Sequence, residues 1–140
     1  MKLTQEEQDN LPVGLLRNAI RTPDGTILQS HHRHDCRHYA DKNGHTYMVD
    51  GGLDYVRRSI NEVFPYKCLN IGLDADIKEI REGLTWGTYG KKGGESLQYK
   101  PLKALSDAHI QAIIDDGYWC SPIMKLELQY RKINGIVVCD

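Results

Sequence analysis

The sequence predicts an α+β fold in which an amino-terminal antiparallel β-meander is covered by carboxy-terminal helices. Two hairpin signals with short turns lie in the first fifty residues, and apolar residues recur at helical spacing in three later segments. The chain of 140 residues is long enough to bury one core. We therefore expect a single domain over residues 15–140, preceded by a tail or docking arm over residues 1–14.

The first hairpin is predicted from a four-residue turn. Residues 22–25 read T-P-D-G, with proline at the second position and glycine at the fourth. This arrangement is typical of a type I turn. We therefore expect antiparallel strands within residues 15–21 and 26–30, joined by this turn.

A second hairpin and a further strand complete the predicted meander. Residues 42–44 read K-N-G, and Asn-Gly favours a tight hairpin turn because both residues tolerate positive φ. The strands of this hairpin are expected within residues 33–41 and 45–50. The glycine pair 51–52 then ends the second strand, and residues 53–60 are expected to return as a further strand.

Three helices are expected in the second half of the chain, at residues 75–83, 106–116 and 122–133. Ser106 suits the N-cap of the second helix because its hydroxyl accepts a bond from a free backbone N–H. Pro122 suits the first turn of the third helix, where its missing N–H costs nothing. These capping residues place the helix starts more firmly than the apolar spacing alone.

The last predicted helix also carries an expectation about assembly. Its apolar stripe is expected to consist of Ile123, Leu126, Tyr130 and Ile133. Met124 and Leu128 extend this stripe to a neighbouring row, so we expect a homo-oligomer. Residues 136–140 are short and mostly apolar, and they are expected to add an edge strand or to seal a subunit contact.

Composition excludes several classes of function. The 18 Lys and Arg residues nearly balance the 19 Asp and Glu residues, for a net charge of −1, so duplex nucleic acid is not an expected partner. No window approaches the roughly twenty apolar residues that span a bilayer, so no membrane is expected. The four cysteines have no CxxC spacing, which favours free thiols in a cytoplasmic protein.

A histidine-rich stretch near the second hairpin offers a metal site as one interpretation. If residues 31–39 form a strand, alternation places four potential ligands on one face. Those side chains are His32, His34, Cys36 and His38. Zinc held by His32 and His34, with His45 or Cys36 as a further ligand, would support phosphodiester hydrolysis. The alternative is a sheet face on which the histidines pair with aspartates, and no cofactor is expected in that case.

Arginines in the same part of the chain suit an anionic ligand better than the histidines do. Arg57 and Arg58 follow a glycine pair, and a guanidinium group matches phosphate oxygens with a planar set of donors. Arg33 and His34 complete the ligand-binding residues predicted in this half. The alternative interpretation is two solvated strand arginines, and strand alternation would leave only one of them in any pocket.

Residues 86–94, with the sequence WGTYGKKGG, form the second predicted ligand-binding segment. Glycines expose backbone N–H groups that can hold an anion, Thr88 adds a hydroxyl group and Lys91 adds charge. Trp86 or Tyr89 offers an aromatic face on which a base can stack. The alternative is a mobile turn whose Trp86 is anchored in the core.

Several blocks of the sequence resemble a family of small, largely uncharacterised proteins encoded by tailed bacteriophages. The blocks are IRTPDGT (20–26), HRHD (32–35), YMVDGGLDYVRRS (47–59), WGTYGKKG (86–93) and LKALSDAHIQAII (102–114). The likeness covers most of residues 17–130, and DGGLDYVRRS and WGTYG are its most specific parts. The resemblance implies a phage accessory protein located in the host cytoplasm.

A phage protein of this size is similar in kind to the anti-defence sponges of the Thoeris and CBASS type. We therefore expect that the protein sequesters a host cyclic nucleotide or an ADP-ribose-type immune signal without cleaving it. The expected partner is a small nucleotide-type ligand. Two alternatives stay open, namely the metal-dependent phosphodiester hydrolase and a protein that inhibits a host enzyme by surface contact.

Overall fold

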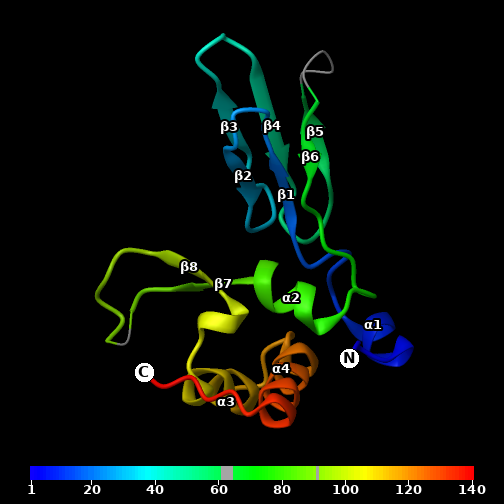
Figure 1. Cartoon of the computed structure of the whole chain (residues 1–140), viewed down its shortest axis with the longest axis vertical. Helices are drawn as coiled ribbons and strands as arrows, with labels where there is room; N and C mark the ends of the chain where they lie inside the picture. The colour runs from blue at the N-terminus through cyan, green and yellow to red at the C-terminus, as the bar shows by residue number, and fades with distance from the viewer. Residues whose placement is uncertain (61–64, 91) are drawn as a thin grey trace. The chain divides into compact units, whose positions relative to one another are not determined.

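A computed structural model of the chain describes residues 1–60, 65–90 and 92–140. They form two compact units, and each is described by itself. The central unit spans residues 13–72, and the flanking unit combines residues 1–12 with residues 73–140. After one short helix, antiparallel strands fill the first half of the chain and the longest helices come last, which confirms the predicted α+β class (Figure 1).

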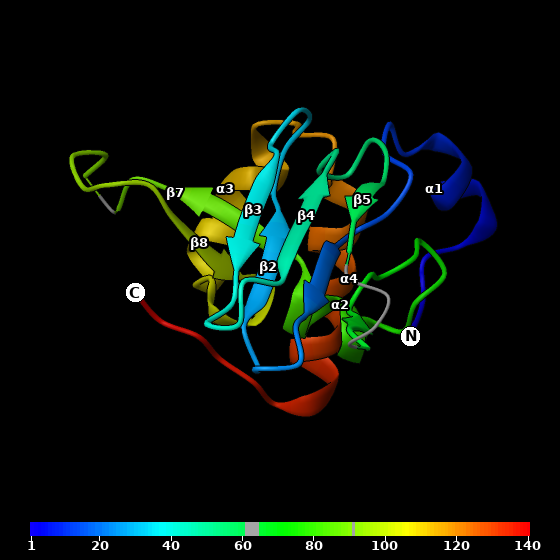
Figure 2. The same ribbon diagram turned by 90° about the horizontal axis from the view of Figure 1, so that it is seen from above.

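The central unit contains two three-stranded antiparallel sheets. The strands are β1 (Asn18–Arg21), β2 (Ile27–Ser30), β3 (Arg37–Ala40), β4 (Thr46–Asp50), β5 (Arg57–Ser59) and β6 (Lys67–Cys68). The first sheet has the order β2-β1-β6 and the second has the order β3-β4-β5. Figure 2 shows the strands of the second sheet side by side.

Both predicted hairpins are confirmed, and their turns are closed by the expected residues. In the first hairpin, the Gly25 N–H donates to the Thr22 carbonyl at 2.9 Å. In the second, the Gly44 N–H donates to the Asp41 carbonyl at 3.0 Å, and Gly44 has a φ of +80°. The strand predicted over residues 53–60 is shorter than expected, because only its last part forms β5.

Apolar side chains between the two sheets form the core of the central unit. Ile20 and Leu28 come from β1 and β2, whereas Tyr47 and Val49 come from β4, and all four are buried. Successive strand residues point to opposite faces, so Met48, between Tyr47 and Val49, lies on the outer face of β4. The outer face of this sheet therefore carries a separate set of side chains.

The strand predicted over residues 31–39 is wrong in its first part, because β3 begins only at Arg37. Local polar bonds replace the strand there. The Ser30 hydroxyl donates to the Asp35 carbonyl at 2.6 Å, and Asp35 Oδ2 accepts a bond from the His31 N–H at 2.8 Å. Such bonds offer the backbone an alternative to a sheet ladder. The proposed histidine face is consequently interrupted by a turn.

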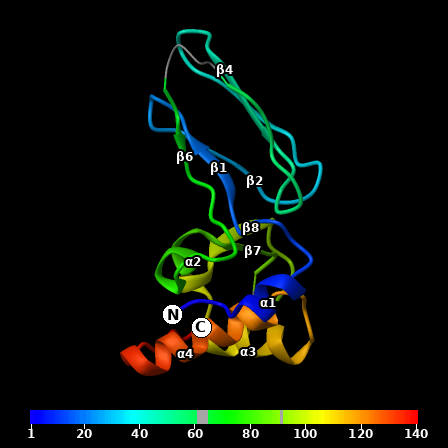
Figure 3. The same ribbon diagram turned by 90° about the vertical axis from the view of Figure 1, so that its right-hand side faces the viewer.

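The flanking unit combines helices with a two-stranded hairpin. Its elements are α1 (Gln5–Asn10), α2 (Ile77–Gly83), β7 (Thr85–Thr88), β8 (Gln98–Pro101), the 3-10 helix η1 (Leu102–Ala104), α3 (Asp107–Asp115) and α4 (Ser121–Asn134). β7 pairs with β8, and Figure 3 shows α3 and α4 side by side. The three predicted helices are confirmed to within two residues at each end. Ser106 caps α3 as expected, since its Oγ accepts a bond from the His109 N–H at 3.0 Å.

Residues 1–14 were expected to be a tail or docking arm, and of these, residues 1–12 belong to the flanking unit. Thr4 caps α1 through a reciprocal pair of bonds with Glu7. Leu3 is buried, and the Ile77 N–H at the start of α2 donates to the Met1 carbonyl at 2.7 Å. The amino-terminal segment is therefore attached to α2.

The apolar stripe predicted for α4 is confirmed at Ile123, which is buried, and wrong at Ile133. Ile133 is 66% exposed, whereas Glu127 and Arg131 are buried together with Ile123 and Met124. The buried face of α4 thus carries two opposite charges in place of the expected Leu126, Tyr130 and Ile133. The charges can lie there because they bond to each other and to further polar groups.

Candidate functional site

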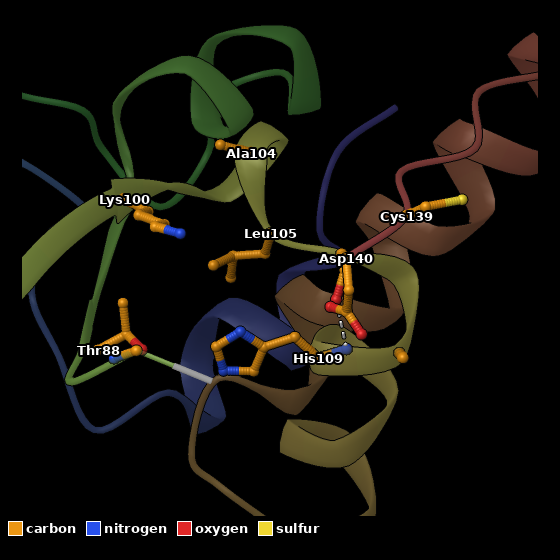
Figure 4. Close-up of a pocket in the computed structure, with 10 residues that line it drawn as sticks. Thr88, Lys100, Ala104, Leu105, His109, Cys139 and Asp140 are labelled. Atoms are coloured by element: carbon orange, nitrogen blue, oxygen red, sulfur yellow. Dashed lines mark hydrogen bonds between the residues drawn. The ribbon is translucent and has the colours of Figure 1, made fainter. Parts of the chain in front are cut away.

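A cavity of about 420 Å³ lies in the flanking unit beside the amino end of α3. Its polar lining comes from three elements, with Thr88 on β7, Lys100 on β8 and His109 in the first turn of α3. Figure 4 shows these three side chains around the same space, with Leu105 between them. The cavity has the size of a small-molecule site and combines a few polar groups with apolar surface.

The lining of this cavity carries charges of both signs beside neutral donors. Lys100 supplies a positive charge, and Thr88 and His109 supply hydrogen-bonding groups. The amino end of α3 adds the positive end of a helix dipole. Asp140 also lines the cavity, so the lining contains a carboxylate acceptor beside these donors.

Arg131 holds the wall of the cavity in place from behind. Its Nη1 donates to the Leu105 carbonyl at 2.8 Å and contacts Asp107 Oδ1 at 2.6 Å, and its Nη2 donates to the Leu102 carbonyl at 3.0 Å. These bonds tie α4 to η1 and to the start of α3. Both segments contribute lining residues, so the buried guanidinium group sets the position of the cavity wall.

The carboxy-terminal segment closes another side of the same cavity. Residues 136–140, expected to add an edge strand or to seal a subunit contact, have no regular secondary structure. The Asp107 N–H donates to the Val138 carbonyl at 2.9 Å. This bond brings Cys139 and Asp140 to the cavity, which both residues line.

The residues of the predicted WGTYGKKGG segment lie in different surroundings in the structure. Thr88 lines the cavity, as does Gly90. Tyr89 lies between them in sequence, and its side chain is 57% exposed. Trp86 lies elsewhere, with its ring edge-on to Tyr118 at a centroid distance of 5.3 Å. Lys91, the fourth predicted residue, lies outside the described residues.

Trp86 also lines a small apolar cavity together with Leu84, Leu102 and Met124, which are all buried. These contacts agree with the alternative interpretation, in which the indole ring is anchored in the core. A ring held in this way has less freedom to stack on a base than the exposed Tyr89 has.

A second polar cluster lies in the central unit, around the buried carboxylate of Asp50. Arg57 Nε donates to Asp50 Oδ2 at 3.0 Å, and this hydrogen bond raises the pKa of Arg57. The Tyr55 hydroxyl lies 3.3 Å from the same oxygen and 2.8 Å from His34 Nδ1. Burial, followed by the Asp50 charge, raises the pKa of Tyr55. The structure therefore connects the predicted residues Arg57 and His34 through Asp50 and Tyr55.

Arg58, the neighbour of Arg57, has a different environment. Its Nη2 donates to Asn18 Oδ1 at 3.1 Å, to the Ala19 carbonyl at 3.3 Å and to Asn70 Oδ1. The guanidinium group thus links β5 to β1 and to the segment after β6. Arg33 is exposed in the turn before β3. The side chains of Arg57 and Arg58 point to opposite faces of the sheet, as strand alternation predicts.

Each of the four side chains named for the metal alternative has a different contact. His32 Nδ1 lies 3.1 Å from the Arg33 carbonyl, and His45 Nδ1 lies 3.4 Å from Asp41 Oδ2. His34 contacts Tyr55, as described above, whereas Cys36 Sγ lies 3.3 Å from His38 Nε2. Within residues 1–60, 65–90 and 92–140, no three His, Cys, Asp or Glu side chains are grouped so as to hold a metal ion.

Lys100 and His109 line the cavity but were not predicted from the sequence as site residues, and the same holds for Asp140. Lys100 follows an extended stretch, and His109 follows the recognised cap Ser106 by three residues. Because Ser106 predicted the amino end of a helix near His109, it was the feature of the sequence that could have indicated an anion site there. Lys100 lies nine residues before His109, on the strand that η1 joins to α3, whereas the pairing of β7 with β8 brings Thr88 to the same cavity.

Comparisons of the chain with models of protein families, with curated proteins and with solved structures found no match. In the parts of the chain that the structure describes, no helix has both the length and the apolar character needed to cross a membrane. The candidate site is therefore interpreted from its own residues.

Proposed function

We propose that the protein binds a phosphate-bearing small molecule of the nucleotide type in the cavity beside α3 and holds it intact. The observation that carries this proposal is the convergence of Lys100, His109 and Thr88 at a helix amino end. A charged hydrogen bond to phosphate contributes about 1.5–3 kcal/mol. Two such contacts supply about 3–6 kcal/mol of the roughly 8 kcal/mol that micromolar affinity requires, and apolar burial has to supply the rest.

The mixed lining favours a nucleotide over inorganic phosphate. Asp140 is a hydrogen-bond acceptor, which suits the hydroxyl groups of a ribose and repels a bare anion. Leu105 supplies apolar surface, and the exposed ring of Tyr89 lies next in sequence to two lining residues. Stacking of a base on such a ring contributes about 1–3 kcal/mol.

The proposal extends from the class of ligand to its identity. The resemblance to tailed-bacteriophage proteins suggests a host immune signal, either a cyclic nucleotide or an ADP-ribose derivative. In this proposal the protein acts as an anti-defence sponge in the cytoplasm of the host. A sponge needs affinity and no turnover, which agrees with a site that is rich in donors.

Calorimetric titration against cyclic dinucleotides, cyclic trinucleotides and ADP-ribose derivatives tests the proposal. We expect binding with recovery of unchanged ligand by chromatography. Lys100→Ala should weaken binding by roughly tenfold or more, because it removes one charged contact. Lys103→Ala is the matched control, since Lys103 pairs with Glu82 and does not line the cavity.

Three results would contradict the proposed function. Heat-silent titrations across the whole panel would leave inhibition of a host enzyme by surface contact as the remaining alternative. Cleavage of the ligand would favour the metal-dependent hydrolase. Equal losses of affinity in Lys100→Ala and Lys103→Ala would show that the cavity is not the binding site.

We also propose that the protein forms a homo-oligomer. Ile133 on α4 is 66% exposed and Val137 is 76% exposed, and a contiguous exposed apolar patch marks a protein–protein interaction site. Sedimentation at increasing concentration tests this proposal. Ile133→Glu should reduce any association, whereas Lys132→Glu on the same turn should reduce it less.

A further inference from the structure

The outer face of the sheet formed by β3, β4 and β5 carries a set of sulfur and nitrogen donors. His38 on β3 lies directly opposite Met48 on β4 in the strand register. Tyr47 and Val49 point into the core, so alternation places Met48 on the outer face together with His38. Cys36 precedes His38 by two residues and contacts its ring, so it lies on the same face.

The arrangement of these three residues suits one shared ion. Cys36 Sγ and His38 Nε2 are 3.3 Å apart, and both side chains are exposed. Sulfur and nitrogen ligands of a single tetrahedral ion lie about 3.5 Å apart. Residues directly opposite in an antiparallel pair have Cβ atoms about 4.5–5.5 Å apart, so the flexible Met48 side chain has the reach to supply a third donor.

We propose that Cys36, His38 and Met48 bind one Cu(I) ion on this face. Thiolate and thioether ligands are soft and select Cu(I), and imidazole also binds copper. A zinc site would need further His, Cys or carboxylate ligands, and no group of three such side chains occurs among the described residues. The use of a methionine therefore distinguishes this proposal from the zinc alternative considered above.

Binding at this site is a ligand exchange without a redox step. The Cys36 thiol loses its proton to solvent as the sulfur–copper bond forms, and the metal stays Cu(I) throughout. Cys36 and His38 already touch, so little reorganisation of these two side chains is needed. This site lies in the central unit and is independent of the nucleotide cavity in the flanking unit.

Anaerobic titration of the full, reduced chain with Cu(I) against the chelator bicinchoninate tests the proposal. We expect one Cu(I) per chain. Cys36→Ser should abolish competition with the chelator, and His38→Ala and Met48→Leu should each weaken binding by roughly tenfold or more. Met48→Leu preserves side-chain volume, and circular dichroism would establish that each variant is folded.

Cys68→Ser is the matched control, because Cys68 is another exposed free thiol of the central unit and lies on β6, outside the sheet that carries the proposed site. It should bind copper as the wild type does. X-ray absorption of the loaded protein should show two sulfur ligands and one nitrogen ligand. Wild-type affinity in Cys36→Ser would overturn the proposal, as would wild-type affinity in both His38→Ala and Met48→Leu. Copper bridged between thiols of two chains would also overturn it.

Discussion

Arg131 and Glu127 lie one turn apart on α4, and the Arg131 Nε atom donates to Glu127 Oε1 at 3.0 Å while both side chains are almost completely buried. Glu127 also accepts from Arg81, whose Nη2 lies 2.9 Å from the same oxygen. Arg131 extends the network to Asp107 on α3. One buried carboxylate therefore lies between two guanidinium groups and connects α2 with α4.

Glu127→Gln should lower the free energy of unfolding by about 3 kcal/mol, because removal of one partner leaves buried charge uncompensated. Urea denaturation measures this change. Lys132→Gln on the same helix is the control, since Lys132 is exposed and its replacement should change stability by less than about 0.5 kcal/mol. A similar effect of both substitutions would contradict the importance of the network.

Gly52→Ala should destabilise the central unit more than Gly25→Ala does. Both glycines have positive φ, which strains any other residue by about 1–2 kcal/mol. A Cβ at Gly52 would lie 2.3 Å from a backbone carbon of His32, whereas a Cβ at Gly25 meets nothing within 4 Å. The difference between the two denaturation midpoints isolates this close approach. Equal midpoints would show that the turn around His32 moves aside freely.

Cys120 should make the flanking unit sensitive to alkaline pH. Burial raises the pKa of its thiol to about 11, above the ordinary value of 9.0. The folded state therefore keeps a proton that the unfolded state loses above pH 9. This contribution is fully present below that pH and is lost as pH rises toward 11, by about 2–3 kcal/mol.

Urea denaturation at several pH values between 8 and 11, in reducing buffer, measures the Cys120 effect. Cys120→Ala should reduce the loss of stability over this range, even if it lowers stability at every pH. Parallel pH profiles of the wild type and the variant would mean that the buried thiol does not contribute.

Arg58→Lys should loosen the connection between β5 and β1. A lysine ammonium group lacks the planar set of donors that reaches Asn18, Asn70 and the Ala19 carbonyl together. We expect faster amide hydrogen exchange in β1 and β5, by about tenfold if 1.4 kcal/mol is lost. Arg33→Lys should leave exchange unchanged, because Arg33 is exposed in a turn. Unchanged exchange in Arg58→Lys would assign the role to charge alone.

The elements predicted correctly are those whose signals are local. Ser106 caps α3, and the turns at Gly25 and Gly44 close the two hairpins. In these cases each residue that specifies the structure bonds to a partner at most four positions away in the sequence. Short-range chemistry of this kind is visible in the sequence.

The errors have a common physical origin in polar groups that satisfy one another. Apolar spacing on α4 favoured Ile133, because the pattern does not reveal that Glu127 can be buried between Arg81 and Arg131. Only some of the residues that line the candidate cavity were predicted from the sequence, for a related reason. Thr88 was predicted, whereas Lys100 reaches the cavity because η1 joins its strand to α3, a connection that no motif in the sequence marks.

The order of the two units along the chain has a consequence for folding during synthesis. The central unit interrupts the flanking unit, and its own ends are joined, since the Leu16 N–H donates to the Ile71 carbonyl at 2.8 Å. It is complete once residue 72 has left the ribosome, whereas the flanking unit must wait for α4. The ends of the folded central unit lie close together, so the connection between residues 12 and 73 of the flanking unit is effectively short. A shorter connection lowers the entropy cost of closing the flanking unit. Residues 1–12 should therefore stay without their partner until α2, to which they are attached, emerges.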